Sequence, residues 1–262
     1  MTTADWQACP LDMNDLDLSG DGLRQHWEAL HMGCPEPFPQ ETAVQDAWRH
    51  YHLGQFAQAY DTGMAAGGAG VVPALFALTM QAQYVEKDEK RRAGLFKLAM
   101  KQCEEAEDNG LVSANLHYIH AVAMGRYSQS ISIFEALAQG FGGRIKEQLQ
   151  KCLELSPKHP EAHATFAGWH AAISDQAGAM MGRMLYGATQ DGAHEHYELA
   201  VSHGPESLIA RTEYARGLEV MYGDKEPDIR KHLEQSLQIK AHDATERLDQ
   251  QLAREHLARL SA

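Results

Sequence analysis

Histidine is the residue type whose number and spacing first suggest chemistry, because the 262 residues include 15 histidines. His117 and His120 are three residues apart, so they share one face of a helix. The segment 194–196 holds a second pair, and His50 and His52 form a third whose members point to different sides of a helix. A zinc site uses three or four ligands, and spacing assigns no third ligand to any pair. We therefore predict no metal and no cofactor, and we interpret most of these histidines as solvated or capping residues.

An acidic run near the N-terminus is the other candidate metal site. Residues 15–21 have acidic or hydroxyl side chains at alternate positions and Gly20 at the turn, which matches the first half of a calcium-binding loop. The second half does not match, because His26 stands where such loops have a bidentate Glu. Turn and cap residues explain the run equally well, so we predict no calcium ion.

No pattern typical of an enzyme accompanies these residues. The sequence has neither the G-x-S-x-G turn of serine hydrolases nor a G-x-x-x-x-G-K phosphate-binding loop. Isolated serines and aspartates are expected in any chain of this size and carry no weight. We predict that the protein is not an enzyme, and an enzyme or metalloprotein is the third alternative.

The charge balance disfavours two classes of partner. The chain has 36 acidic and 23 basic residues, which gives a formal net charge of −13. Duplex nucleic acid and anionic membranes both attract basic surfaces, so neither is a predicted partner. No run of about 18 apolar residues predicts a transmembrane segment, and the N-terminal residues do not resemble a signal peptide. The four cysteines are scattered, so we expect a cytoplasmic protein, or a periplasmic one if an export signal has been removed.

The apolar residues that position these side chains recur at helical spacing, most clearly in residues 151–169. An apolar helix face ends at Leu155, and Pro157 stops the helix because proline lacks an N–H and clashes with the preceding turn. Pro160 suits the first turn of the next helix, where a missing N–H costs nothing. The segment therefore predicts the joint between two helices.

Similar joints recur along most of the chain. They predict an all-α fold, an α-solenoid of about five helical hairpins over residues 41–262, with an irregular segment over residues 1–40 that includes one short helix from Gly22. A glycine-rich stretch at residues 63–70 is predicted to be flexible and poorly helical, because glycine loses much backbone entropy on folding. Asp243 is the predicted N-cap of a C-terminal capping helix that closes the stack.

Two of the hairpins are longer than the others. Pro157 and Pro205 both end a helix and lie 48 residues apart, whereas a common helical-hairpin repeat has about 34 residues. The additional residues include two short apolar segments followed by glycine, at residues 131–137 and 180–186. We predict that each segment forms an inserted short helix and that the two inserted helices pack next to each other.

Several joints resemble a known family of repeats. The motifs Gly54-x-Phe56-x-x-Ala59, Leu153-x-Leu155-x-Pro157 and Ala200-Val-x-x-x-Pro205 resemble tetratricopeptide repeats over about residues 41–241. The enlarged hairpins and residues 151–167 are similar to the T-component of tripartite substrate-binding (TRAP) transporters, and to regulator-of-microtubule-dynamics proteins. The resemblance to the T-component implies a helical protein with a lined apolar channel. Neither resemblance supplies a catalytic motif.

The tetratricopeptide resemblance implies a groove lined by the first helix of each hairpin. In the fourth and fifth hairpins the groove positions are Glu161, Ala164, Thr165, Gly168, Ile209, Thr212, Glu213 and Arg216. These residues are small, apolar or mildly acidic, so they do not favour the terminal carboxylate of a chaperone tail. The leading predicted function is a non-enzymatic protein-binding or scaffold protein that uses the concave face of the repeat.

The methionine-rich second insert supports an alternative function. Methionine adapts to irregular apolar surfaces, so this insert would either complete a core or line an adaptable binding surface. The alternative is a carrier for a small apolar ligand held between the inserted helices, similar to a TRAP-transporter T-component. The predicted ligand-binding residues are His117, Tyr118, His120, Ile131, Phe134, Leu137, Phe166, Trp169, Met181, Arg183, Met184 and Leu185. The predicted partner is therefore a protein or a small apolar molecule.

Overall fold

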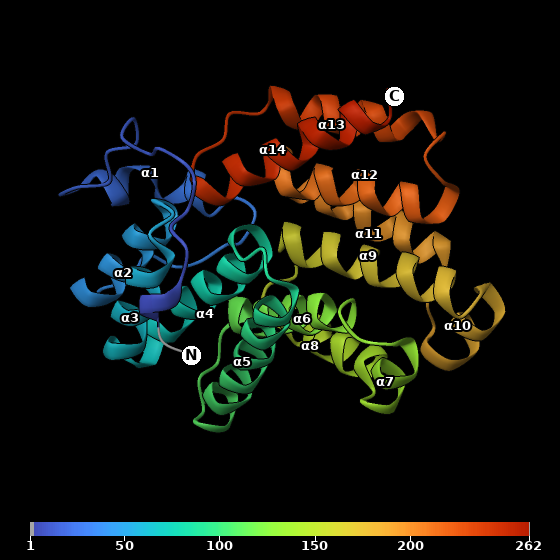
Figure 1. Cartoon of the computed structure of the whole chain (residues 1–262), viewed down its shortest axis with the longest axis horizontal. Helices are drawn as coiled ribbons and strands as arrows, with labels where there is room; N and C mark the ends of the chain where they lie inside the picture. The colour runs from blue at the N-terminus through green and yellow to red at the C-terminus, as the bar shows by residue number, and fades with distance from the viewer. Residues whose placement is uncertain (1–2, 262) are drawn as a thin grey trace. The chain divides into compact units, whose positions relative to one another are not determined.

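Every regular element that the computed structural model describes is a helix, over residues 3–261 apart from the side chain of Ile133. No β-strand occurs between residues 3 and 261, so the predicted all-α solenoid is confirmed (Figure 1). The chain divides into two compact units. The first unit consists of the N-terminal residues up to Phe141, except Met32–Pro35, together with Asp243–Thr245. The second unit consists of Met32–Pro35 and the remaining C-terminal residues.

The first unit is built around successive helical hairpins. Its helices are α1 (Gly22–Leu30), α2 (Thr42–His52), α3 (Phe56–Ala66), α4 (Val71–Met80), α5 (Glu89–Asp108), α6 (Ala114–Ser128) and α7 (Ile133–Ala138). An apolar stripe of α2 is buried, with Val44 and Trp48 at most 2% exposed. Gly54 has φ +71°, a left-handed conformation that glycine adopts without strain, and it separates α2 from α3. A π-helical turn over Gln81–Val85 follows α4.

The second unit continues the same pattern. Its helices are α8 (Phe141–Leu155, of which Phe141 belongs to the first unit), α9 (Pro160–Gln176), α10 (Ala179–Tyr186), α11 (Gln190–His203), α12 (Leu208–Tyr222), α13 (Pro227–Gln238) and α14 (Ala244–Arg259, of which the first two residues belong to the first unit). Helix α9 packs against both α11 and α12, and α12 packs against α13. Ala253 of α14 belongs to the buried cluster of these helices, so α14 covers the last hairpin as the predicted capping helix does.

Close packing in the second unit depends on one tyrosine and one glycine. Tyr197 of α11 is fully buried and its ring stacks on Tyr214 of α12, with ring centroids 4.4 Å apart. A Cβ atom at Gly217 of α12 would overlap the ring and hydroxyl of Tyr197. The absence of a side chain at position 217 therefore lets α11 and α12 approach each other.

The joint between α8 and α9 forms at Pro157 and Pro160, as the sequence predicts. Helix α8 ends at Leu155 and α9 begins at Pro160. The residue that caps α9 is His159, whose Nδ1 accepts a hydrogen bond from the N–H of Ala162 at 3.1 Å. Histidine rarely caps helices, so cap preferences gave no signal for it.

The inserted segments are the short helices that the sequence predicts. They are α7 and α10, and each lies between the two long helices of an enlarged hairpin in the order of the chain. Helix α7 belongs to the first unit and α10 to the second. Their predicted packing against each other stays a prediction.

The glycine-rich stretch differs from its prediction. Helix α3 continues through Gly63 to Ala66, and a 3₁₀ turn over Gly68–Gly70 follows directly. A Cβ atom at Gly63 would overlap the carbonyl oxygen of Gly70, so glycine permits a tight contact here. The prediction of a poorly helical stretch was wrong, because it weighed the entropy of glycine and not this packing.

None of the helices between residues 3 and 261 combines the length and the apolar character that a membrane span needs.

Candidate functional site

Helix α10 presents the most exposed apolar surface of the second unit. Met180 is 78% exposed, Met184 67% and Leu185 59%, and Met181 is also exposed. The opposite side of the helix is held close to α9, because Gly182 is buried and the carbonyl oxygen of Ile173 would lie only 3.3 Å from a Cβ there. A helix fixed on one side therefore displays a row of methionine and leucine side chains to solvent.

Two basic side chains lie on α10 or at its C-terminal end. Arg183 is exposed on the helix itself. Lys146 of α8 donates a hydrogen bond from Nζ to the carbonyl oxygen of Tyr186 at 2.8 Å, which also caps the C-terminal end of α10. Gly187 follows with φ +71° and ends the helix in a left-handed conformation.

Helix α7 shows a smaller apolar surface in the first unit. Phe134 is 81% exposed and Leu137 is 54% exposed, while Ile131 just before the helix is half-buried. Ser132 caps the helix by accepting a hydrogen bond from the N–H of Glu135 at 3.2 Å. The predicted site residues of both inserted helices thus face solvent.

The three aromatic residues of α6 and α9 among the predicted ligand-binding residues are buried in the helical core. Tyr118 of α6 is 5% exposed and lies beside Phe76, with ring centroids 6.0 Å apart. Phe166 and Trp169 of α9 are each 6% exposed and contact each other in a T-shaped arrangement. Trp169 also donates a hydrogen bond from Nε1 to the carbonyl oxygen of Gly142 at 2.8 Å. A shared ligand wall formed by these residues and the inserts stays a prediction.

The predicted histidine pair of α6 meets one carboxylate. His120 Nδ1 lies 2.7 Å from Glu107 Oε1, and His117 Nδ1 lies 3.7 Å from Glu107 Oε2. Glu107 is near the end of α5, so both histidines join α6 to the preceding helix. The structure therefore brings His117 and His120 together, as their spacing predicts.

A larger histidine cluster lies between α9 and α11 in the second unit. His163 Nδ1 is 2.9 Å from His196 Nδ1, and His163 Nε2 donates to the carbonyl oxygen of Pro157 at 3.0 Å. His196 also stacks on His170, with ring centroids 5.6 Å apart, and makes a tilted contact with Phe166 at 4.5 Å between ring centroids. These contacts hold the two helices together through neutral imidazole rings.

Burial keeps these rings neutral. It lowers the pKa of His170 to about 4, with a smaller effect from Lys146. It also lowers the pKa of His196 to about 4, with His163 and His170 contributing, and the pKa of the capping residue His159 to about 3. The α9–α11 cluster therefore stays uncharged at neutral pH.

The first unit contains a buried chain of polar side chains that sequence analysis missed. His52 Nδ1 lies 2.9 Å from Asp243 Oδ2, and His52 Nε2 lies 3.2 Å from His31 Nε2. Trp48 stacks on His52, and Trp27 lies 3.9 Å from His31 between ring centroids. His31 and Asp243 are 212 positions apart in the sequence (243 − 31), so no local spacing could have indicated the contact. Of the histidine pair noted in the sequence, His50 and His52, His52 belongs to this buried chain.

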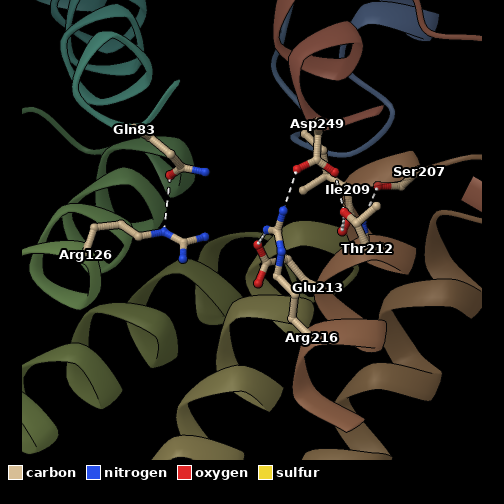
Figure 2. Close-up of polar contacts among 9 residues, drawn as sticks. Gln83, Arg126, Ser207, Ile209, Thr212, Glu213, Arg216 and Asp249 are labelled. Carbon is tan, nitrogen blue, oxygen red and sulfur yellow. Dashed lines mark hydrogen bonds and ion pairs between the residues drawn. The ribbon is translucent and has the colours of Figure 1, made fainter. Parts of the chain in front are cut away.

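Two predicted groove positions hold the capping helix. Figure 2 shows Asp249 of α14 accepting hydrogen bonds from Thr212 and Arg216 of α12, the latter at 3.2 Å. Arg216 also pairs with Glu213, and the side chain of Asp249 is fully buried. Another groove position, Ala164, is buried in the cluster with Ala200 and Ala210. These positions therefore serve contacts between helices.

Figure 2 also shows a polar contact of the first unit. Arg126, near the end of α6, donates from Nε to Gln83 Oε1 at 3.2 Å. Gln83 belongs to the π-helical turn that follows α4. The contact therefore links this turn to α6.

Among the described residues, no group of three or more histidine, cysteine, aspartate or glutamate side chains is arranged to hold a metal ion.

Comparison with known proteins identifies a family. A family model described as "Regulator of microtubule dynamics protein 1-3" matches residues 74–210, which is just over half of the chain. The match covers α4 to α11 and the first residues of α12, and therefore both inserted helices and the α9–α11 histidine cluster. The search of curated proteins found no match to the chain.

Proposed function

Because the chain belongs to the regulator of microtubule dynamics protein 1-3 family, we propose that it is a non-enzymatic protein-binding scaffold whose partner docks on the exposed apolar face of α10. The observation that carries this proposal is the row formed by Met180, Met184 and Leu185, each more than half exposed on a helix that is fixed to α9. An exposed apolar row costs solubility unless a partner covers it. Methionine adapts to varied partner surfaces, as in other helix-binding proteins.

The proposal refines where a partner would dock on the repeat. The sequence favours the concave face of the first helices, yet Ala164 and Thr212 in that face are buried between helices. Thr165 and Gly168 are only half-buried, but they offer little apolar area. Helix α10 offers more surface, so we place the main contact there. The family description names microtubule dynamics, so purified tubulin is the first partner to test.

Photo-crosslinking tests this docking surface. A photoreactive amino acid at position 184 should give a discrete crosslinked protein in cells, and the same group at exposed position 238 on α13 should not. Replacing Met180 with Lys should suppress the product from position 184, because a charged side chain would have to be desolvated in the contact. Equal crosslinking from both positions, or none from position 184, would contradict the proposal.

A carrier for a small apolar molecule is the second candidate, supported by the same exposed methionines. Native mass spectrometry of the freshly purified protein separates the two functions. A co-purifying apolar molecule that is lost in the Met180→Lys variant would support the carrier, whereas the scaffold predicts the mass of the bare chain.

The cytoplasm is the proposed compartment. None of the four cysteines forms a disulfide bond, and Cys103 and Cys152 are buried. Burial raises the pKa of Cys152 to about 12, which keeps this thiol protonated and unreactive. Treatment of the native protein with a thiol reagent should therefore modify Cys9 and Cys34 before the two buried thiols.

A further inference from the structure

A second surface of the second unit combines aromatic rings with carboxylates. His194 of α11 stacks on Tyr222 at the end of α12, with ring centroids 5.8 Å apart and planes 21° apart. Tyr222 is 46% exposed. A large side chain this exposed contributes little to the core, so its fixed position needs another explanation.

Hydrogen bonds fix the orientation of the exposed tyrosine. His194 Nε2 lies 2.7 Å from the hydroxyl of Tyr222, and His194 Nδ1 lies 3.5 Å from the hydroxyl of Tyr214. Tyr214 donates its own proton to Glu198 Oε1 at 3.0 Å, so its oxygen is left to accept from His194. His194 is then protonated on Nδ1 and accepts from Tyr222 on Nε2. The chain of hydrogen bonds runs from Tyr222 to Glu198 in one direction.

This direction determines which partner groups the surface can satisfy. The proton of Tyr222 is used within the protein, so its hydroxyl oxygen can only accept a further hydrogen bond. Tyr214 stays protonated because burial, followed by Glu198, raises its pKa well above the usual range. A partner must therefore supply donors, and the exposed ring of Tyr222 additionally favours a cation over its face.

The charged side chains around the rings of His194 and Tyr222 are mainly acidic, which suits a cationic partner group. Asp191, Glu195 and Glu198 are exposed on α11, and their spacing places them with His194 on one face of the helix. Asp224 is exposed in the loop that follows Tyr222. Lys225 follows in the same loop, so the acidic excess lies on the α11 side. The whole chain has a net charge of −13, which strengthens attraction of basic partners.

We infer that the surface formed by His194, Glu195, Glu198 and Tyr222, hereafter the α11–α12 surface, docks a basic segment of a partner protein. A lysine or arginine of that segment lies over the ring of Tyr222, and the carboxylates of Glu195 and Glu198 bind its basic groups. The ring is held by His194 before binding, so little side-chain entropy is lost. This surface is separate from α10, and the inference does not depend on the function proposed for that helix.

A labelled helical peptide of lysine, leucine and alanine tests the inference by fluorescence anisotropy at physiological salt. The protein should bind this peptide and not a matched peptide with glutamate in place of lysine. Tyr222→Ser should weaken binding about fivefold or more, the size of a cation–π contact. Tyr222→Phe keeps the ring and loses the bond to His194, so it should weaken binding less.

Matched controls separate the α11–α12 surface from diffuse charge attraction. Glu198→Gln should weaken binding more than Glu234→Gln, an equal change of charge at an exposed position on α13. A Met180→Lys/Met184→Lys variant should still bind the peptide. This result distinguishes a failure of docking on α10 from a failure of the α11–α12 surface. Circular dichroism should show unchanged helix content in every variant. Absence of peptide binding, or equal losses in the Glu198→Gln and Glu234→Gln variants with none in Tyr222→Ser, would overturn the inference.

Discussion

The two enlarged hairpins repeat one order of helices and differ in the contacts of their first helix. In the first hairpin, α6 is tied to the preceding helix α5 by a histidine and a carboxylate, His120 and Glu107. In the second, α9 is tied to α11 by histidines that contact each other, His163 and His196. The inserted helix also differs, since α10 is fixed to α9 through Gly182. A repeated backbone therefore carries different side-chain chemistry, and only the second hairpin combines an acid-sensitive core with an anchored apolar helix.

Acid should destabilise the second hairpin most, and this is the largest expected effect. The pKa values of His159, His170 and His196 lie well below those of histidine in an unfolded chain, so unfolding takes up protons below about pH 6.5. Stability is then fully present above pH 6.5 and is lost as pH falls toward 4. The slope is on the order of 1 kcal/mol per pH unit for buried His159 and less for the other two, which solvent reaches.

Urea unfolding between pH 4 and 7 measures this loss. A His196→Gln variant should show a shallower acid slope, whereas His26→Gln on the exposed face of α1 serves as the control. A slope that His196→Gln leaves unchanged would show that the α9–α11 cluster does not control acid stability.

Two glycine substitutions should move stability in opposite directions. Gly217→Ala should destabilise the protein by roughly 1–3 kcal/mol, because the new Cβ overlaps Tyr197 and forces α11 and α12 apart. Gly125→Ala in α6 meets no atom within 4 Å and should stabilise by about 0.5–1 kcal/mol through helix propensity. Thermal unfolding of both variants checks the pair. Similar shifts in the two variants would mean that the Tyr197 contact is not as tight as described.

Release of α10 from α9 should be a local effect. Gly182→Leu places a bulky side chain against Ile173, so amide hydrogens of α10 should exchange faster while those of α12 keep their protection. Gly143→Ala in α8, where no atom lies within 4 Å, is the matched control. Unchanged exchange in α10 of the Gly182→Leu variant would show that Gly182 does not anchor the helix.

Charged substitutions on the inserted helices should have the smallest effect on stability. Met180→Lys/Met184→Lys on α10 and Phe134→Lys on α7 change exposed side chains, so the free energy of unfolding should change by about 0.5 kcal/mol or less. The two variants should nevertheless differ in binding, because only α10 is the proposed docking helix. A large loss of stability in either variant would show that its side chains belong to the core.

The sequence predicts elements formed by local patterns. The end of α8, the start of α9 at Pro160 and both short inserted helices follow from proline positions and apolar spacing. The spacing of His117 and His120 predicts that they share a helix face, but it does not predict that both contact Glu107. Such patterns act within one or two helical turns.

Contacts between distant residues gave no sequence signal. The chain from Asp243 through His52 to His31 joins three separate segments, and the α9–α11 cluster depends on the approach of two helices. Whether Met184 is buried or exposed also depends on tertiary packing, because an amphipathic insert can turn its apolar side either way. Gly63 shows the same limit, since its role is set by the nearby carbonyl of Gly70.

Methyl NMR of the methionine side chains tests the central claim, docking on α10, most directly. The chain has 11 methionines, and the exposed Met180 and Met184 can be compared with fully buried Met124 in one spectrum. On addition of the protein recovered by crosslinking, the account predicts that the signals of Met180 and Met184 shift or broaden and that the signal of Met124 stays unchanged. Binding that leaves both α10 signals in place, while other methionine signals move, would contradict it.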